Sequence, residues 1–107
     1  PIAKQQNTQF VIADLATKIE AAKSLVYAAA EAKQNKAPDL SVRAAMAKLY
    51  AAEVAMEVTT KAVQLHGGYG YTREYPVERM MRDAKITEIY EGTSEVQRMV
   101  IAGSLLR

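Results

Sequence analysis

The sequence predicts an all-α fold, an antiparallel helical bundle of two long and two shorter helices. Apolar residues recur at steps of three and four through two long segments, which is the period of a helix. Glycine, proline and asparagine are concentrated between such segments, where they favour turns. Half of the 107 residues are apolar and 24% are charged, a composition typical of a globular chain of one domain.

The first long helix is expected from about Gln9 to Lys36. Asp14 and Lys18 are spaced one turn apart and form a pair that favours the helix. The apolar stripe on one face consists of Val11, Leu15, Ile19, Ala22, Val26 and Ala29. The stretch from Gln34 to Asp39 contains an asparagine and a proline and predicts a turn.

The second long helix is expected from about Leu40 to Leu65, with Asp39 or Ser41 able to cap its start. One apolar stripe is made of Val42, Ala45, Leu49, Ala52, Met56 and Val63. A second apolar face is added by Met46, Tyr50, Val54, Val58 and Ala62. A helix with two apolar faces is expected to be covered on more than one side.

Three glycines, Gly67, Gly68 and Gly70, end that helix, because glycine in a helix interior costs about 1 kcal/mol relative to alanine. Such a loop most often serves as a helix C-cap and a turn. Its backbone amides would also let a flat or anionic ligand lie against the main chain. No strand precedes it, so it is not a dinucleotide-binding fingerprint.

The last third of the chain predicts two shorter helices. The first is expected from Pro76 to about Ala84, and Glu78 is placed to pair with Arg82 across one of its turns. After a link from Ile86 to Gly92, the final helix is expected from about Ser94 to Leu105. Its buried residues are predicted to be Val96, Val100, Ile101 and Leu105.

Glu91 is the most informative residue of the chain, a carboxylate on a non-helical kink directly before a helix. Gly92 permits backbone angles that are closed to other residues and lets a ligand approach closely. Thr93 or Ser94 can cap the final helix, and Ser94 with Gln97 fits a capping box. The plainer interpretation of Glu91 is an exposed first-turn acid; the alternative is a functional carboxylate.

Two separated motifs resemble the C-terminal signature of the acyl-CoA dehydrogenases, most closely the short-chain, butyryl-type members. The second motif, from Tyr90 to Arg98, resembles the segment that holds the family's catalytic base. Pro1 to Gln9 resembles the segment that enters the family's C-terminal domain, so the resemblance covers essentially the whole chain. The first motif is defined by the spacing of Gln64, Gly67, Gly68, Gly70, Glu74, Arg79 and Asp83.

The resemblance implies α,β-dehydrogenation of an acyl-CoA thioester to the 2-enoyl-CoA, with FAD as the hydride acceptor. It implies that Glu91 is the catalytic base and that Gly92 borders the acyl-CoA. The segment from Gln64 to Gly68 would contact the flavin of a neighbouring subunit. In full, the implied FAD contacts are Gln6, Gln64, Leu65, His66, Gly67, Gly68, Thr93 and Glu95; no metal site is implied.

The residues around these motifs have plainer interpretations of their own. His66 by itself predicts a helix-end cation or capping group, without a catalytic role. Arg79, Arg82 and Asp83 are expected to form an ion-pair cluster that fixes the loop between the two motifs. Packing at the end of the bundle is favoured over stacking on a base for Tyr69, Tyr71, Tyr75 and Tyr90.

Residues 1–107 are expected to be a C-terminal domain that lacks the family's N-terminal helical and middle β domains. Those domains supply most of the flavin pocket, so we expect the chain alone to be inactive and to lose FAD. An isolated helical oligomerisation module is the alternative. The expected partners are acyl-CoA, an electron-transferring flavoprotein as acceptor, and further copies in a dimer or tetramer that cover Tyr50, Val54 and Val58.

Composition argues against several other classes. Fourteen Lys and Arg are scattered among twelve Asp and Glu, which argues against a nucleic-acid partner. The chain has no cysteine and one histidine, which excludes disulfides and thiolate metal sites. No apolar run reaches the roughly 18 residues of a membrane span. A soluble intracellular protein is expected, in the cytoplasm if bacterial and in the mitochondrial matrix if eukaryotic.

Overall fold

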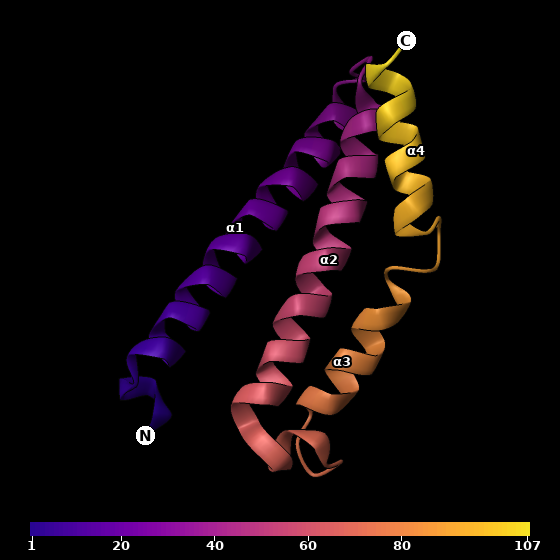
Figure 1. The fold of residues 1–107 in the computed structure, drawn as a ribbon. Coiled ribbons are helices and arrows are strands. Elements are labelled where there is room, and N and C mark those ends of the chain that lie inside the picture. Colours follow the sequence, from indigo (N-terminus) through magenta and orange to yellow (C-terminus); the bar gives the residue numbers. More distant parts are fainter.

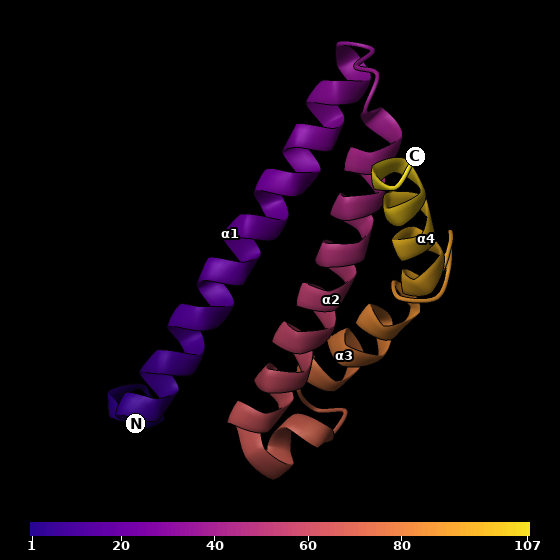
Figure 2. The ribbon, with the colours of Figure 1, turned by 45° about the horizontal axis from the view of Figure 1, so that its top comes forward.

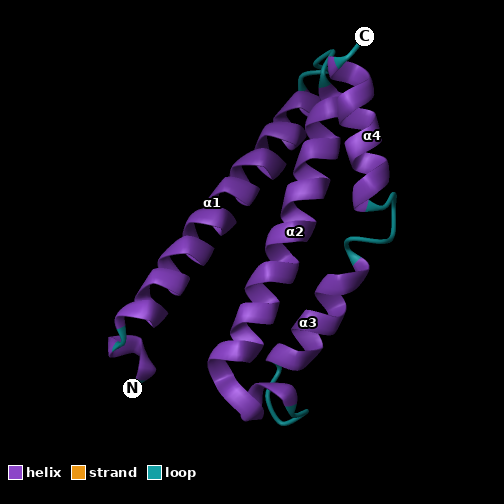
Figure 3. Ribbon diagram, in the orientation of Figure 1, coloured by secondary structure: helices purple, strands orange, loops and turns teal.

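The computed structural model describes residues 1–107 and contains helices and loops but no strand, which confirms the predicted fold class (Figures 1 and 3). Four α-helices are present, and a short 3₁₀ segment precedes the first and follows the second. In chain order the elements are η1 (Ile2–Lys4), α1 (Gln6–Gln34), α2 (Leu40–His66), η2 (Gly67–Tyr71), α3 (Val77–Ile86) and α4 (Ser94–Leu105). No helix is both long and apolar enough to cross a membrane.

The central element of the bundle is α2. Helix α1 runs antiparallel along one side of it, while α3 and α4 follow each other along the other side (Figures 1 and 2). Helix α2 packs against all three other helices, whereas α1 packs against neither α3 nor α4. The prediction that the second helix is covered on more than one side is therefore confirmed.

The core between the helices is thin and is built mainly from alanines. Only eleven of the 107 residues are buried, and no large side chain is completely enclosed. Leu15 of α1 and Val54 of α2 are the largest apolar side chains among them. Small side chains let the helices approach closely, but they leave much apolar surface outside the contacts.

Helix α4 shows the consequence, because most of its predicted core residues are not buried. Val96, Val100 and Leu105 are 44%, 40% and 68% exposed, Ile101 is half-buried, and the one buried residue of α4 is Ser94. The prediction was wrong because α4 packs only against α2. Its apolar pattern marks a face, and no second helix of this chain covers that face.

The bounds of the other helices agree with prediction to within three residues. Helix α1 begins at Gln6 instead of Gln9, and α3 begins one residue after Pro76. The predicted side-chain cap at Asp39 is absent, because its carboxylate accepts a hydrogen bond from Arg43 Nε at 2.7 Å. The side-chain cap of α2 is thus replaced by an ion pair between the residue before the helix and Arg43 in its first turn.

Ion pairs tie α1 to α2, and the pair between Lys85 and Glu88 ties α3 to the loop that follows it. Lys18 Nζ donates to the two carboxylate oxygens of Glu57 at 2.6 and 2.9 Å, and this hydrogen bond raises the pKa of Lys18. The predicted cluster in α3 resolves into two separate pairs one helical turn apart. These pairs are Arg82 with Glu78 and Arg79 with Asp83. Both lie within α3, so the residues of the predicted cluster do not themselves fix the loop between the motifs.

Candidate active site

The loop between α3 and α4 places Glu91 on a backbone kink outside any helix. Its φ is 55° and that of Gly92 is 91°, both in the left-handed region. Glycine reaches this region at no steric cost, whereas a residue with a side chain is strained there. Strain of this kind is concentrated at functional sites. A Cβ at Gly92 would also lie 2.7 Å from Nε2 of Gln97, so a side chain here would displace the end of the Gln97 side chain.

Side chains from two helices hold this loop in place. Lys48 of α2 donates from Nζ to the carbonyl oxygen of Gly92 at 2.7 Å. Gln97 of α4 donates from Nε2 to the carbonyl oxygens of Glu91 and Gly92, at 3.3 and 3.4 Å. Both carbonyls are therefore drawn toward the bundle, while the side chain of Glu91 remains exposed.

The amides of the same loop are free. The backbone N–H groups of Glu91, Gly92 and Thr93 donate to no acceptor in the chain. All peptide bonds are trans, so the N–H and C=O of one peptide point in opposite directions. The N–H groups of Gly92 and Thr93 therefore point away from Gln97 and Lys48. Consecutive free amides beside left-handed residues are suited to binding an anionic oxygen.

Thr93 caps the start of α4, which was one of the two caps predicted, the other being Ser94. Its side-chain oxygen accepts a hydrogen bond from the backbone N–H of Val96 at 3.2 Å. The predicted capping box of Ser94 and Gln97 does not form, because Ser94 is already the first helical residue and Gln97 reaches back to the loop. The hydroxyl of Ser94 is buried and has no hydrogen-bond partner.

A polar cavity of about 450 Å³ lies beside the start of α4. It brings together Thr93 and Glu95, two of the implied FAD contacts, with Arg98, which pairs with Glu53 of α2 at 2.6 Å. The first turn of a helix presents the positive end of its dipole to such a cavity. The lining residues are Glu53, Lys85, Glu88, Ile89, Thr93, Ser94, Glu95 and Arg98.

The glycine loop lies at the far end of α2, and its glycines differ in their surroundings. Gly67 ends α2 with a φ of 64°, and its N–H donates to the carbonyl of Gln64. A Cβ at Gly67 or Gly68 would meet nothing within 4 Å. At Gly70, which is buried, a Cβ would lie 2.6 Å from the carbonyl oxygen of Val63. Gly70 is thus needed for packing, whereas the other two leave open backbone.

Aromatic side chains gather only partly around this loop. His66 bonds through Nδ1 to a backbone carbonyl one turn earlier at 2.7 Å, which is the helix-end role predicted for it. Tyr69 and Tyr75 meet edge to face at 5.9 Å between ring centroids. The packing prediction is wrong for Tyr71 and Tyr90, which are 78% and 52% exposed, and Tyr69 is still 70% exposed despite its contact with Tyr75.

The structure separates the implied FAD contacts into two groups. The α2 segment from Lys48, beside the Glu91 loop, to His66 measures about 27 Å at ~1.5 Å per residue. Gln6, at the start of α1, lies at the glycine-loop end, where an apolar groove of about 490 Å³ is bordered by Thr8 and Leu65. Figure 1 shows the two loops at different levels of the bundle. One chain therefore does not bring all the implied FAD contacts together.

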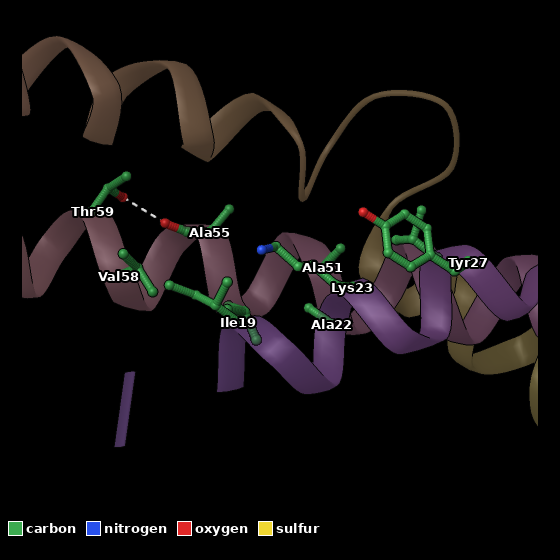
Figure 4. A pocket seen from close by; sticks show the side chains of 10 residues that line it. Ile19, Ala22, Lys23, Tyr27, Ala51, Ala55, Val58 and Thr59 are labelled. Carbon is green, nitrogen blue, oxygen red and sulfur yellow. Dashed lines mark hydrogen bonds between the residues drawn. The ribbon is translucent and has the colours of Figure 1, made fainter. Parts of the chain in front are cut away.

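An apolar groove of about 400 Å³ runs between α1 and α2 (Figure 4). Val54 and Val58 border it, and Val54 is only 5% exposed. Of the three residues that further copies were expected to cover, Val54 is therefore already buried within one chain, and Tyr50 and Val58 are half-buried. The lining residues are Ile19, Ala22, Lys23, Val26, Tyr27, Ala51, Val54, Ala55, Val58 and Thr59.

Residues 1–106 match the family model of the acyl-CoA dehydrogenase C-terminal domain. A short-chain specific acyl-CoA dehydrogenase of Clostridium acetobutylicum is 64% identical over 104 residues, which are 97% of this chain and 27% of the relative. The CarC subunit of the caffeyl-CoA reductase–Etf complex of Acetobacterium woodii is 58% identical over 106 residues, 99% of this chain and 28% of the relative.

Solved structures agree with these sequence relatives. Butyryl-CoA dehydrogenase from Megasphaera elsdenii superimposes with a TM-score of 0.97 at 60% identity, over 100% of this chain and 28% of that chain. The chain thus spans little more than a quarter of the length of the relatives it matches. It belongs to the acyl-CoA dehydrogenase family, in which it matches the C-terminal helical domain.

Proposed function

We propose that this chain is the base-bearing C-terminal domain of a flavin-dependent acyl-CoA dehydrogenase that converts an acyl-CoA to the 2-enoyl-CoA. The observation that carries the proposal is Glu91, an exposed carboxylate on a strained kink beside three free backbone amides. The N-terminal helical and middle β domains would belong to the same enzyme. The family match supports this assignment.

In the proposed reaction the carboxylate of Glu91 removes the α proton of the thioester. Negative charge then develops on the thioester oxygen. The free amides of residues 91 to 93 are suited to hold that oxygen. Gly92 allows the substrate to approach the main chain because it has no side chain.

The residues present fit FAD at two places. Thr93 and Glu95 border the polar cavity at the start of α4, in which the buried hydroxyl of Ser94 lacks a partner. Gly67 and Gly68 leave open backbone at the other end of α2, near Gln64, Leu65, His66 and Gln6. FAD, when bound, supplies the acceptor for the β hydrogen. The two groups would serve flavins of different subunits, which requires a homo-oligomer.

Acyl-CoA is the proposed substrate, and an electron-transferring flavoprotein is the proposed acceptor of its electrons. The relative from Acetobacterium woodii is named as a subunit of an Etf complex, which supports this acceptor. We expect the enzyme to act in the cytoplasm of a bacterium or in the mitochondrial matrix of a eukaryote.

Glu91→Gln in the full-length enzyme tests the proposed base, because glutamine keeps the shape of the side chain but cannot take the proton. We expect turnover to fall by roughly 10⁴-fold while flavin remains bound. Glu20→Gln, at an exposed position of α1, is the matched control and should keep its turnover. Near-normal turnover by a folded, flavin-loaded Glu91→Gln enzyme would contradict the assignment.

A helical oligomerisation module without activity of its own is the second candidate function. The observation in its favour is the apolar surface left bare on α1 and α4, where Phe10, Tyr27 and Met99 are 57%, 66% and 72% exposed. Light scattering of residues 1–107 should then give a dimer or tetramer without flavin. A mass that stays at 11.8 kDa at every concentration would contradict it.

A further inference from the structure

Lys48 differs from the other bonded lysines of the chain in the partner of its ammonium group. It lies in the middle of α2 and donates to the carbonyl oxygen of Gly92, 44 residues away in sequence, at 2.7 Å. It takes part in none of the chain's ion pairs, whereas Lys18, Lys23 and Lys85 all pair with carboxylates. Its one partner is therefore the loop that carries Glu91.

This hydrogen bond is the shortest of those that side chains donate to the carbonyls of Glu91 and Gly92. A charged donor makes a stronger bond than a neutral one. The two bonds from Gln97, at 3.3 and 3.4 Å, are near the upper limit for a hydrogen bond. Lys48 is also half-buried. Removing an ammonium group from water costs free energy unless its N–H groups donate hydrogen bonds. Removing Lys48 would leave the Gly92 carbonyl with only the long contact from Gln97.

The direction of this carbonyl determines where the active groups point. Because the peptide is trans, a carbonyl of Gly92 turned toward Lys48 sends the N–H of Thr93 the opposite way. Glu91 is next to this peptide and has a strained φ of 55°, which persists only where surrounding contacts enforce it. The Lys48 bond is the strongest of those contacts.

We propose that Lys48 is a positioning residue, which holds the Glu91–Gly92 turn so that the carboxylate and the free amides face the same substrate. This inference rests on the proposed function of Glu91. Lys48 touches neither substrate nor proton in this account. It acts through the backbone of Gly92.

The test uses the full-length, FAD-loaded enzyme with saturating butyryl-CoA, and follows flavin reduction in a single turnover. Lys48→Met keeps the length of the side chain but removes its donors. We expect the rate of flavin reduction to fall roughly 10- to 100-fold, because misplacing a catalytic group by about 1 Å lowers a rate by as much as about 100-fold. KM should change less than about threefold, and flavin content should be retained.

Lys48→Arg keeps the charge and the donors and should recover most of the lost rate. The matched control is Lys61→Met, at an exposed position of the same helix, and it should keep the wild-type rate. A purely structural role would lower the melting temperature of Lys48→Met and leave the rate of the folded enzyme unchanged. That result would overturn the proposal.

Three further outcomes are decisive. If Lys48→Met does not fold, Lys48→Gln, a shorter neutral donor, replaces it, and an unchanged rate in that variant overturns the proposal. If Glu91→Gln also turns over normally, the proposed function itself fails. If Glu91→Gln is inactive while Lys48→Met, or Lys48→Gln in its place, keeps the wild-type rate, only the role of Lys48 fails.

Discussion

The two glycine-bearing loops of this chain share a left-handed glycine but differ in what holds them. Gly92 lies in a loop that α2 and α4 grip through Lys48 and Gln97. Gly67 lies in a loop that packs through the buried Gly70 and the Tyr69–Tyr75 contact and leaves open backbone at Gly67 and Gly68. The first loop therefore has its geometry set within one chain. The second loop leaves main chain open at Gly67 and Gly68, where FAD of a neighbouring subunit is proposed to bind.

Gly70→Ala should give the largest change in stability in this comparison. The new Cβ would lie 2.6 Å from the backbone carbonyl of Val63, which cannot move without distorting α2. We expect a loss of about 3 kcal/mol in the free energy of unfolding of residues 1–107, measured by urea and circular dichroism. Gly68→Ala meets nothing within 4 Å and should leave the midpoint unchanged or slightly higher.

Gly92→Ala and Gly67→Ala compare the two loops at glycines that both have a positive φ. Both place a side chain at positive φ, so each should lose about 1 kcal/mol of stability. Only at Gly92 does the new Cβ displace a side chain, Nε2 of Gln97 at 2.7 Å. With flavin and substrate saturating, the full-length enzyme should lose at least tenfold in kcat with Gly92→Ala and little with Gly67→Ala. Equal kcat values would remove the distinction between the loops.

The smallest effect on stability is expected from lowering the pH, through Glu78 at the glycine-loop end of α3. The hydrogen bond from Arg82 lowers the pKa of Glu78 below its ordinary value of 4.5. Its contribution to stability is therefore present above pH 4.5 and is lost as the pH falls through the lower, folded-state pKa. Wild-type and Glu78→Gln melting temperatures should differ slightly at pH 6 and converge well below pH 4. A gap that persists in acid would contradict this ion pair.

The sequence was sufficient to predict the helices and the position of the Glu91 kink. Both predictions rest on local sequence signals. Helical periodicity predicts α2, and a glycine beside a cap residue predicts that α4 starts at Ser94. The contact from Lys48 was not predicted, since its partner is 44 residues away and nothing local distinguishes it from a solvated lysine. A charged residue between the two apolar faces of α2 was the one available signal.

The misplaced core of α4 has a related cause. Periodicity identified the apolar face of Val96 and Val100, but it does not say which element covers that face. Similarly, Thr93 and Ser94 were equivalent cap candidates in sequence. Only the backbone angles, with Thr93 extended and Ser94 helical, decide between them.

The central claim is that Glu91 removes the α proton, and proton exchange tests it independently of hydride transfer. The full-length, flavin-loaded enzyme is incubated in deuterated water with an acyl-CoA whose β position is sulfur and has no hydride to give. We expect the wild-type enzyme and Glu20→Gln to exchange the α protons, followed by mass spectrometry, and Glu91→Gln to be slower by roughly 10³-fold or more. Exchange at the wild-type rate by Glu91→Gln would contradict the claim and place the base elsewhere.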